Sequence, residues 1–327
     1  MPVPRVLVLS PQPSVLLMEA LKAALADDWE LVRPTTQAAL KDQLPTVDVV
    51  LGDWSGRFVL DAEAAHWGRG LRLVQQPGVG VEYIDLAAWA AVGVPVANAA
   101  GANADAVAEW AVGATIHLLR QMSWADARIR AGEWPSSAVA VTRVRELSAM
   151  RVGIVGFGPI GRKYAQLVRP FGCAISYWSR NRRPPQMEAG AVYRELNDLL
   201  ATSDVLVVAV ALSAETRGLM GADELARLPE NAVLVNVARG AVLDEVALLG
   251  ALGSGKLAGA ALDVFAREPL AADSPLRAAA NLLLSPHISA ATPSALGRTF
   301  DTAAQNVRRV LRGEPALGIV NRPAATS

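Results

Sequence analysis

The three histidines of the chain are the first candidates for acid–base chemistry, and they stand in different settings. His287, in LLLSPHISAAT, follows a predicted buried strand at its carboxyl end, where ligands collect in open α/β sheets. His66, in AAHWGRG, falls at the predicted end of a helix, and His117 lies in the apolar helical stretch ATIHLLR. We therefore interpret His66 as a surface residue, His117 as a hydrogen-bonded core residue and His287 as the candidate acid or base.

Two charged residues could act with His287 on a carbonyl compound. Arg239, in VLVNVARGAVLDE, comes just beyond another apolar strand, and Gly240 beside it would let the backbone turn. The planar guanidinium can contact a carboxylate and an adjacent carbonyl. Glu268, in LDVFAREPL, could hydrogen-bond the His287 ring, which would favour the protonated ring near neutral pH. Reduction of a ketone needs such a proton donor and such a cation, with a hydride donor held close.

The hydride donor is predicted from GFGPIG at residues 156–161, which matches the pattern G-x-G-x-x-G. An apolar run at 152–155 precedes this loop, a predicted helix follows to about residue 171, and a second strand is expected at 174–178. Strand, glycine loop, helix and strand in this order form a dinucleotide-binding unit. Gly156 would make the tight turn, Gly158 would let a pyrophosphate approach, and Gly161 would allow close helix packing. The amides at the helix start would face the phosphates.

The residue after the second strand distinguishes the two nicotinamide cofactors. An Asp or Glu at this place accepts hydrogen bonds from the ribose 2′-hydroxyl of NAD. Here Ser179 occupies the place, followed by Arg180 and then by Arg182 and Arg183. A serine does not repel a 2′-phosphate, and a guanidinium can bind one. We therefore predict NADP(H), with NAD(H) as the alternative if the arginines form only a solvated edge.

Length and composition narrow the class of protein. At 327 residues two domains are expected, and a net charge of +0 without a long charged block argues against nucleic acid as a partner. No stretch offers about 18 uninterrupted apolar residues for a membrane span, and we predict no signal peptide. The single cysteine, Cys173, allows neither an internal disulfide nor a cysteine zinc site and is expected to be buried. We predict a cytoplasmic protein without a metal.

The elements that would position these residues follow from the apolar pattern. A helix at 14–25 with Ser14 as its cap, and strands at 5–9, 29–32, 47–51, 71–75 and 94–97, predict a small α/β domain with a largely parallel sheet. Strands at 204–210, 232–236, 259–263 and 282–284 would join 152–155 and 174–178 in a doubly wound sheet. A last amphipathic helix is expected at 292–312. The first domain has no glycine fingerprint after residues 5–9, so the second should hold the dinucleotide.

Between these domains lies an unusually apolar helical region at 104–121 and 124–131, with Trp110, Trp124 and Trp134 in or near it. Such a helix is either part of a core or part of a subunit interface. We favour the interface, and therefore predict a homodimer formed through the nucleotide domain.

Taken together, these segments resemble the D-isomer-specific 2-hydroxyacid dehydrogenases in order and spacing. The likeness spans roughly residues 70–300 and is carried by the glycine loop, NVARG, LDVFAREPL and SPHIS, together with QPGVGVEYIDL at 76–86, VANAAGANADAVAEWAV at 96–112 and RAGEW at 130–134. The resemblance implies a flavodoxin-like α/β substrate domain built from residues 1–99 and 289–327. A Rossmann dinucleotide-binding domain at 100–288 would be inserted into it.

The resemblance also implies roles for individual residues. Arg239 would bind the substrate, His287 would protonate its carbonyl oxygen, and Glu268 would tune His287. The backbone amides of Val79 and Gly80 would hold the substrate carboxylate. The cofactor would contact Gly156, Gly158, Pro159, Ile160, Gly161, Ser179, Arg180, Val210, Ala211, Thr216, Val237, Ala238 and Asp263.

The chain departs from the family pattern at two places, with Ala211 where many members have proline and Trp110 where many have histidine. Neither change removes a catalytic group. The pair Ser179–Arg180 resembles the branch of glyoxylate and hydroxypyruvate reductases that prefers NADPH. The pocket for the substrate would be set by residues 51–56 and by a partner subunit, and neither carries a decisive signature.

Three functions are compatible with this pattern. The leading hypothesis is reduction of a small 2-oxo acid, such as glyoxylate or hydroxypyruvate, by NADPH to the D-2-hydroxy acid. The second is an NADH-dependent dehydrogenase of a bulkier or phosphorylated acid such as 3-phosphoglycerate, although the first domain lacks a basic cluster to bind a phosphate. The third is a dinucleotide-sensing protein of the corepressor type, which would need a peptide groove or disordered tails.

Overall fold

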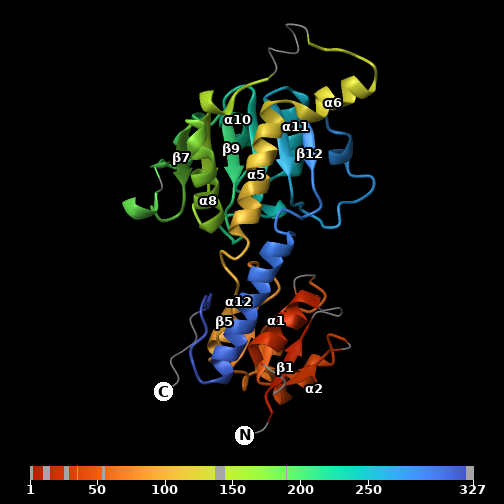
Figure 1. The fold of residues 1–327 in the computed structure, drawn as a ribbon, viewed down its shortest axis with the longest axis vertical. Helices are drawn as coiled ribbons and strands as arrows, with labels where there is room; N and C mark the ends of the chain where they lie inside the picture. Colours follow the sequence, from red (N-terminus) through yellow and green to blue (C-terminus); the bar gives the residue numbers. More distant parts are fainter. Residues whose placement is uncertain are drawn as a thin grey trace. The chain divides into compact units, whose positions relative to one another are not determined.

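The chain forms two compact units in the computed structural model, which describes residues 3–9, 15–25, 29–34, 36–53, 56–136, 144–188 and 190–321. The smaller unit combines Met1–Asn103 with Pro293–Ser327, and the larger unit is the continuous segment Ala104–Thr292 (Figure 1). The predicted cap Ser14 lies outside the described residues.

The smaller unit is built on a parallel sheet with the strand order β2-β1-β3-β4-β5. Its strands are β1 (Arg5–Val8), β2 (Glu30–Val32), β3 (Val49–Leu51), β4 (Leu73–Gln75) and β5 (Val96–Ala97). Its helices are α1 (Val15–Leu25), α2 (Leu40–Gln43), α3 (Ala62–Trp67), α4 (Leu86–Ala91) and α12 (Pro293–Leu311). This order is that of flavodoxin-like sheets, which confirms the predicted fold of this unit.

Alternation along β1 explains why helices cover both faces of this sheet. Val6 and Val8 face a core shared with α1 and α12, whereas Leu7 packs in a second core with α2, α3 and α4. The helix α12, from the far end of the chain, lies beside α1 (Figure 1). Its Asn306 donates a hydrogen bond of 2.8 Å to the side-chain oxygen of Gln75 at the end of β4. The C-terminal segment is therefore an integral part of the smaller unit.

The larger unit is also built on a parallel sheet, with the order β12-β11-β10-β9-β6-β7-β8. Its strands are β6 (Arg151–Val155), β7 (Ala174–Trp178), β8 (Val192–Tyr193), β9 (Val205–Val208), β10 (Ala232–Asn236), β11 (Leu257–Leu262) and β12 (Leu282–Leu284). Its helices are α5 (Ala104–Leu119), α6 (Met122–Arg130), α8 (Pro159–Val168), α9 (Leu196–Ala201), α10 (Ala222–Arg227) and α11 (Glu245–Gly253). The order reverses at β6, as in a doubly wound Rossmann sheet, and confirms that prediction.

One strand of this sheet was not predicted. The sequence indicated six strands, but β8 (Val192–Tyr193) adds a seventh at the edge, beside β7. It has only two residues, and Val192 is 57% exposed. Such a short, half-exposed edge strand produces no apolar run for a sequence pattern to detect.

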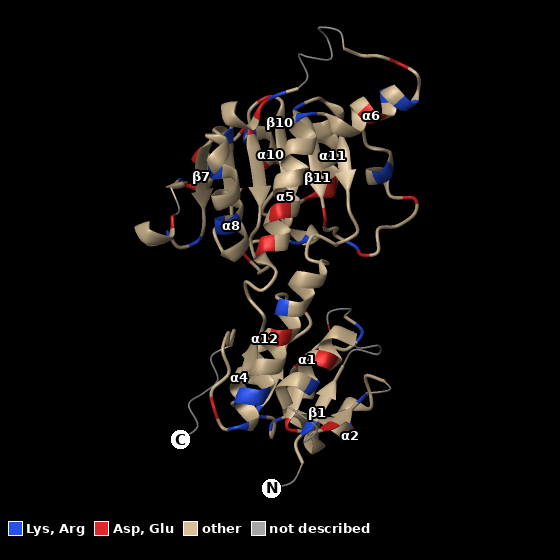
Figure 2. Cartoon of the chain, viewed as in Figure 1, with Lys and Arg blue, Asp and Glu red and all other residues tan. Residues whose placement is uncertain are grey.

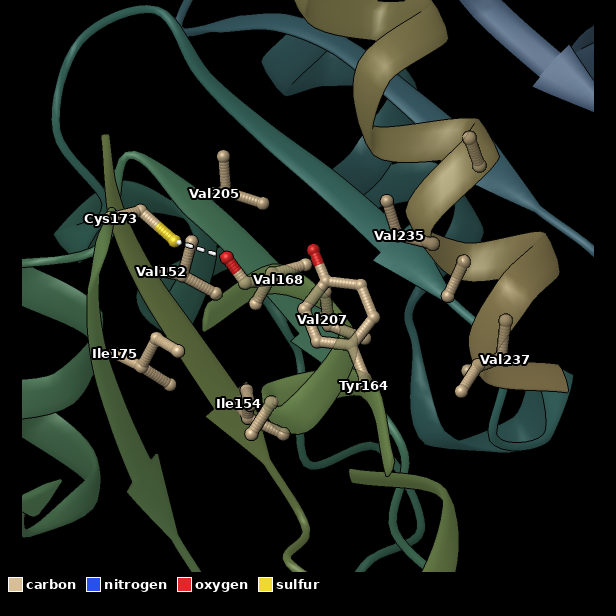
Figure 3. Close-up of a cluster of buried hydrophobic side chains, with 14 of the residues drawn as sticks. Val152, Ile154, Tyr164, Val168, Cys173, Ile175, Val205, Val207, Val235 and Val237 are labelled. Carbon is tan, nitrogen blue, oxygen red and sulfur yellow. Dashed lines mark hydrogen bonds between the residues drawn. The ribbon is translucent and has the colours of Figure 1, made fainter. Parts of the chain in front are cut away.

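Two apolar cores lie on the opposite faces of the larger sheet. On one face, α5 and α8 pack against the valines and isoleucines of β6, β7, β9 and β10, and Tyr164 of α8 lies among them (Figure 3). On the other face α9, α10 and α11 contribute Leu199, Leu225 and Leu248. Cys173 is buried as predicted; its thiol donates to the Val168 carbonyl, and burial raises the pKa of the thiol.

The apolar helix α5 belongs to the core of its own unit. It packs beside α8, and Thr115 forms a hydrogen bond of 2.9 Å with Tyr164. The exposed apolar residues lie further along the chain, where Met122 and Ile129 of α6 are 47% and 49% exposed and Trp134 is 82% exposed. Of the two alternatives considered for this region, a core helix or a subunit interface, α5 is therefore a core helix.

Charged residues lie mainly on helices and loops. Lys and Arg are interspersed with Asp and Glu in both units, and the strands are almost entirely uncharged (Figure 2). Among the described residues, no helix combines the length and the apolar character that crossing a membrane would require. The short 3-10 turns that link the elements are Leu44–Thr46, Leu147–Ala149, Arg169–Phe171, Pro185–Met187, Gly240–Val242 and Pro275–Ala278.

Candidate active site

The glycine loop joins β6 to α8 at the point where the strand order of the larger unit reverses. Gly156 has φ +101°, and a Cβ there would lie 2.7 Å from the backbone of Ala209 and Val210. A Cβ on Gly161 would lie 2.1 Å from the carbonyl oxygen of Gly156, so the helix can pack this closely only with glycine. At Gly158 a Cβ would meet no protein atom within 4 Å. The space beside Gly158 thus fits an external group, as a pyrophosphate would require.

Two features hold this loop in position. Gly158 is the N-cap of α8 and Pro159 follows at its first turn, so the amides at the helix start are directed toward the loop. Phe157, between the first two glycines, stacks on Tyr177 of β7 with ring centroids 3.9 Å apart. The Arg183 guanidinium donates a hydrogen bond of 3.2 Å to the Phe157 carbonyl oxygen. The loop is therefore fixed to the end of β7.

The end of β7 carries the residues predicted to select the cofactor. Ser179 is buried, and its hydroxyl donates a hydrogen bond of 2.7 Å to the carbonyl of Asn181. Arg182 pairs with Glu188 at 3.0 Å, and Arg183 is bonded to the glycine loop. Arg180 is exposed, and a nitrogen of its guanidinium lies 3.6 Å from Oε2 of Glu215. Arg180 and Arg182 are similarly exposed, at 63% and 62%, but Arg180 has the longer ion pair and is therefore the more readily redirected to an added phosphate.

The loop after β9 approaches the glycine loop from the other side. Thr216 closes it, because its hydroxyl donates to the carbonyl of Ala211 at 2.7 Å and accepts from the amide of Ser213 at 2.8 Å. Val210 is partly exposed and Ala211 is exposed at its start, whereas Thr216 is buried. A contact of Val210, Ala211 and Thr216 with the cofactor stays a prediction.

Arg239 stands in the loop after β10, and a buried amide shapes that loop. The side chain of Asn236, at the last position of β10, accepts from the Ala238 amide at 3.0 Å and donates to the Arg239 carbonyl at 3.4 Å. The Arg239 guanidinium donates to the Ala238 carbonyl at 2.7 Å and is half-buried. Val237 and Ala238 are buried beside it. Sequence reasoning missed Asn236, although a polar residue closing the apolar strand AVLVN was a detectable signal.

Gly240 has a different role from the one that the sequence indicated. We expected it to let the backbone turn, but a Cβ there would lie 1.7 Å from the carbonyl carbon of Phe265. The requirement is therefore one of space between two loops. The turn that carries Arg239 packs directly on the segment that leads to Glu268, so the loops after β10 and β11 lie in contact.

Glu268 and His287 meet although they are 19 residues apart in the chain. One carboxylate oxygen of Glu268 lies 2.8 Å from Nδ1 of His287, and the other accepts a hydrogen bond of 3.0 Å from the Phe265 amide. The two side chains remain 36% and 43% exposed. Because Nδ1 is engaged by Glu268, Nε2 is the ring nitrogen available to exchange a proton with a bound molecule.

The backbone that carries His287 is anchored by Asp263, which is fully buried at the end of β11. The Asp263 carboxylate accepts hydrogen bonds from the Ser285 hydroxyl and from the amides of Ile288 and Ser289, the last two at 2.9 Å. The His287 amide donates to the Asp263 carbonyl at 2.8 Å. His287 has φ +56°, a conformation that non-glycine residues adopt rarely and that surrounding contacts must hold. Ser285 was not predicted, and the contact of Asp263 with a cofactor stays a prediction.

The other predicted residues lie elsewhere. Val79 and Gly80 are partly exposed in the loop after β4 of the smaller unit, where the Val79 carbonyl accepts from Asn98 at 2.6 Å. His66 is exposed near the end of α3, as predicted. His117 is partly buried and bonds Ser123 at 2.8 Å, and burial lowers the pKa of its ring. Residues 54 and 55 of the predicted pocket segment lie outside the described residues.

Comparison with known proteins places this arrangement in a family. Residues 112–289 match the NAD binding domain of the D-isomer specific 2-hydroxyacid dehydrogenases. A glyoxylate reductase of Aeropyrum pernix is 35% identical over 303 residues, covering 90% of this chain and 89% of the relative. A D-3-phosphoglycerate dehydrogenase of Mycobacterium leprae is 34% identical over 308 residues, covering 93% of this chain but 57% of the relative.

Solved structures agree with the sequence comparison. A glyoxylate reductase from Paecilomyes thermophila superposes with a TM-score of 0.85 and 31% identity, covering 98% of this chain and 99% of the other. An NAD-dependent formate dehydrogenase from Staphylococcus aureus in complex with NAD gives 0.79 and 27% identity, with 95% and 96% covered. The predicted family is therefore confirmed: the chain belongs to the D-isomer-specific 2-hydroxyacid dehydrogenases and is an oxidoreductase that uses a nicotinamide dinucleotide.

Proposed function

We propose that this protein reduces a small 2-oxo acid of the glyoxylate or hydroxypyruvate type to the D-2-hydroxy acid, with NADPH as the preferred cofactor. The observation that carries the proposal is the hydrogen bond between Glu268 and Nδ1 of His287, at the carboxyl ends of adjacent parallel strands. The loop of Arg239 packs on the same segment. Glyoxylate reductases at 34–35% identity over about 90% of the chain support the substrate class.

In the proposed mechanism, each side chain has one task. When bound, the nicotinamide supplies the hydride. His287 gives a proton from Nε2 to the carbonyl oxygen of the substrate, and the Glu268 carboxylate stabilises the protonated ring through Nδ1. Arg239 binds the substrate carboxylate and polarises the carbonyl. Val79 and Gly80 would contribute backbone amides to the same carboxylate.

The preference for NADPH rests on the end of β7. Ser179 offers no negative charge to repel a 2′-phosphate, and its hydroxyl is used within the loop. Arg182 and Arg183 are held by Glu188 and by the glycine loop, so Arg180 is the residue we assign to the phosphate. Replacement of Arg180 by Ala should weaken NADPH binding by about tenfold and leave NADH binding nearly unchanged. An equal loss for both cofactors would remove the assignment.

Initial rates test the substrate class directly. The purified protein would be assayed with NADPH and with NADH against glyoxylate, hydroxypyruvate, pyruvate and longer 2-oxo acids. Strong NADPH-dependent turnover of the small acids is the expected result. Turnover with NADH alone would retain the chemistry of His287 and Arg239 and refute the cofactor preference. Tight dinucleotide binding without turnover of any acid would favour the sensing protein.

A second candidate function is oxidation of a phosphorylated D-2-hydroxy acid with NAD, which the relatives named D-3-phosphoglycerate dehydrogenase favour. The chain spans 57% of the length of those relatives. Comparing 3-phosphoglycerate and NAD with D-glycerate and NADP as substrate pairs separates the two candidates. A clear advantage of the first pair would replace our leading proposal.

The proposed assembly is a homodimer that covers the exposed apolar residues after α5. Trp134, Ile129 and Met122 are exposed, and a cavity of about 280 Å³ between α6 and Trp134 has an almost entirely apolar lining. A contiguous apolar surface of this kind is typical of a protein contact. Light scattering of the wild type and of Trp134→Glu would test it, because a dimer should dissociate more readily after the substitution.

A further inference from the structure

Glu215 stands where it can influence the cofactor site without belonging to the predicted set. It lies in the loop after β9, one residue before Thr216, and its Oε2 is 3.6 Å from a guanidinium nitrogen of Arg180. Arg180 comes from the loop after β7. Because β6 lies between β9 and β7 in the sheet, the ion pair spans the carboxyl end of the strand that leads into the glycine loop. It therefore joins the two loops between which the adenosine half of a dinucleotide would lie.

The Glu215 carboxylate is held in this position as an anion. The Ser213 hydroxyl donates a hydrogen bond of 2.6 Å to the same oxygen that faces Arg180. This bond, together with a backbone amide and the nearby guanidinium, lowers the pKa of Glu215. The negative charge is thus present at neutral pH, and its direction toward Arg180 is set by the loop itself.

The ion pair adds little to the stability of the fold. The two side chains are 63% and 68% exposed, and 3.6 Å is longer than a hydrogen bond. Exposed pairs of this kind contribute little to the stability of a folded protein. A residue at this place can therefore be changed without unfolding the unit, and its charge acts mainly on whatever else approaches Arg180.

We infer that Glu215 is a specificity-determining residue that competes with the 2′-phosphate of NADPH for Arg180. This inference rests on the proposed assignment of Arg180 to that phosphate. When NADPH binds, Arg180 exchanges the Glu215 carboxylate for the phosphate, and two negative groups are left close together. NADH brings no phosphate, so the ion pair persists across the bound adenosine. Glu215 thereby lowers the affinity for NADPH and leaves that for NADH almost unaffected.

The test is Glu215→Gln, which keeps the shape of the side chain and removes its charge. Dissociation constants for NADPH and NADH would be measured by isothermal titration calorimetry at low, fixed ionic strength. We expect the NADPH dissociation constant to fall by about two- to fivefold, the effect of removing one exposed charge pair, and the NADH dissociation constant to stay within about 1.5-fold. Added salt should diminish the gain, because the groups are exposed.

The matched control is Glu230→Gln. Glu230 is likewise an exposed glutamate in an ion pair, with Lys256 at 2.9 Å, but it precedes β10 and so lies at the amino ends of the strands, away from the loops that carry Arg180 and Glu215. The Glu230→Gln substitution should change the dissociation constant of neither NADPH nor NADH. Tighter binding of NADPH in both variants, or an equal gain for NADPH and NADH in Glu215→Gln, would overturn the inference, because net charge alone would then explain the result.

A variant with both changes, Arg180→Ala and Glu215→Gln, separates this inference from the proposal beneath it. If Arg180→Ala weakens NADPH but Glu215→Gln does not strengthen it, the competition is refuted and the phosphate assignment stands. If Arg180→Ala has no effect on NADPH, the assignment itself fails. When both are right, the gain from Glu215→Gln disappears in the Arg180→Ala background, and an undiminished gain there would contradict the role of Arg180.

Discussion

Replacing Glu268 by Gln removes one charge beside the proton donor and changes little else in the loop. The Oε1 atom accepts from the Phe265 amide at 3.0 Å, and the amide oxygen of Gln can take over that bond. The Oε2 atom, 2.8 Å from Nδ1 of His287, would become an NH₂ group. Two donors would then face each other whenever the ring is protonated, so the variant favours the neutral ring.

The geometry sets the size of the effect. A hydrogen bond to a charged group is worth about 1.5–3 kcal/mol, which corresponds to about a 10- to 150-fold loss of kcat/KM. Because Glu268 and His287 keep 36% and 43% exposure, solvent screening places the loss near the lower end, at about tenfold.

The assay is kcat/KM for reduction of the best 2-oxo acid at neutral pH, with NADPH saturating. The control is Glu245→Gln: the Glu245 carboxylate accepts from the Ala266 amide at 2.7 Å and so holds the same loop without contacting His287. This control variant should keep nearly the wild-type kcat/KM. A Glu268→Gln enzyme with wild-type kcat/KM would refute the tuning of His287 by Glu268. An equal loss of kcat/KM in the two variants would show that Glu268 only holds the loop in position.

Three further predictions concern the rest of the larger unit. Arg239→Ala should lower kcat/KM by about 30-fold or more, from the loss of about 2 kcal/mol of contact, while the Kd for dinucleotide stays within about twofold; normal turnover would rule out its role. Gly158→Ala should keep the wild-type Tm yet weaken the binding of both cofactors, whereas Gly161→Ala, whose Cβ would lie 2.1 Å from the nearest atom, should lower the free energy of unfolding by about 1–3 kcal/mol. Thermal melts and binding titrations would measure both effects, and unchanged cofactor binding in Gly158→Ala would contradict the role of the loop. Asp204 accepts three hydrogen bonds from Arg151, one from the amide and two from the guanidinium. The bonds from the guanidinium are the main cause that lowers the pKa of Asp204. Asp204→Asn should therefore lower the free energy of unfolding at pH 7, measured by urea unfolding, by about 1 kcal/mol. The difference between the variant and the wild type should vanish as the pH falls from the unfolded pKa of about 3.9 through the lower folded pKa, because acid then protonates the wild-type carboxylate. A difference that persists in acid would contradict this origin.

The regular elements could be predicted because polar turn residues mark the ends of their apolar runs. The strand β10 was predicted with its observed bounds, because the apolar run AVLVN stands between polar turns, and the same is true of β7 and β12. The strand β8 could not be, because its pairing with β7 depends on the position of the neighbouring chain rather than on its own composition.

The candidate site was predictable to a similar depth. The meeting of Glu268 and His287 follows from the adjacency of β11 and β12, since the carboxyl ends of neighbouring parallel strands lie close together. Asn236 left a signal as the polar residue that closes an apolar strand, but the function of Ser285 could not be derived, because it depends on a hydrogen bond that exists only once a loop has folded. Gly240 shows the same limit, since its neighbour Phe265 is distant in sequence.

The discontinuous make-up of the smaller unit has a consequence for synthesis on the ribosome. The larger unit is one continuous segment, so every residue of its two cores is available once Thr292 has been translated. The smaller unit is begun first, but its core between α1 and the sheet includes Phe300 and Val307 of α12. Until α12 emerges, Leu17 and Leu21 have their partners in the sheet but lack those that α12 contributes to the same core. The part of the chain that is made first is therefore the last to complete its core, and a nascent chain is most exposed to aggregation through α1.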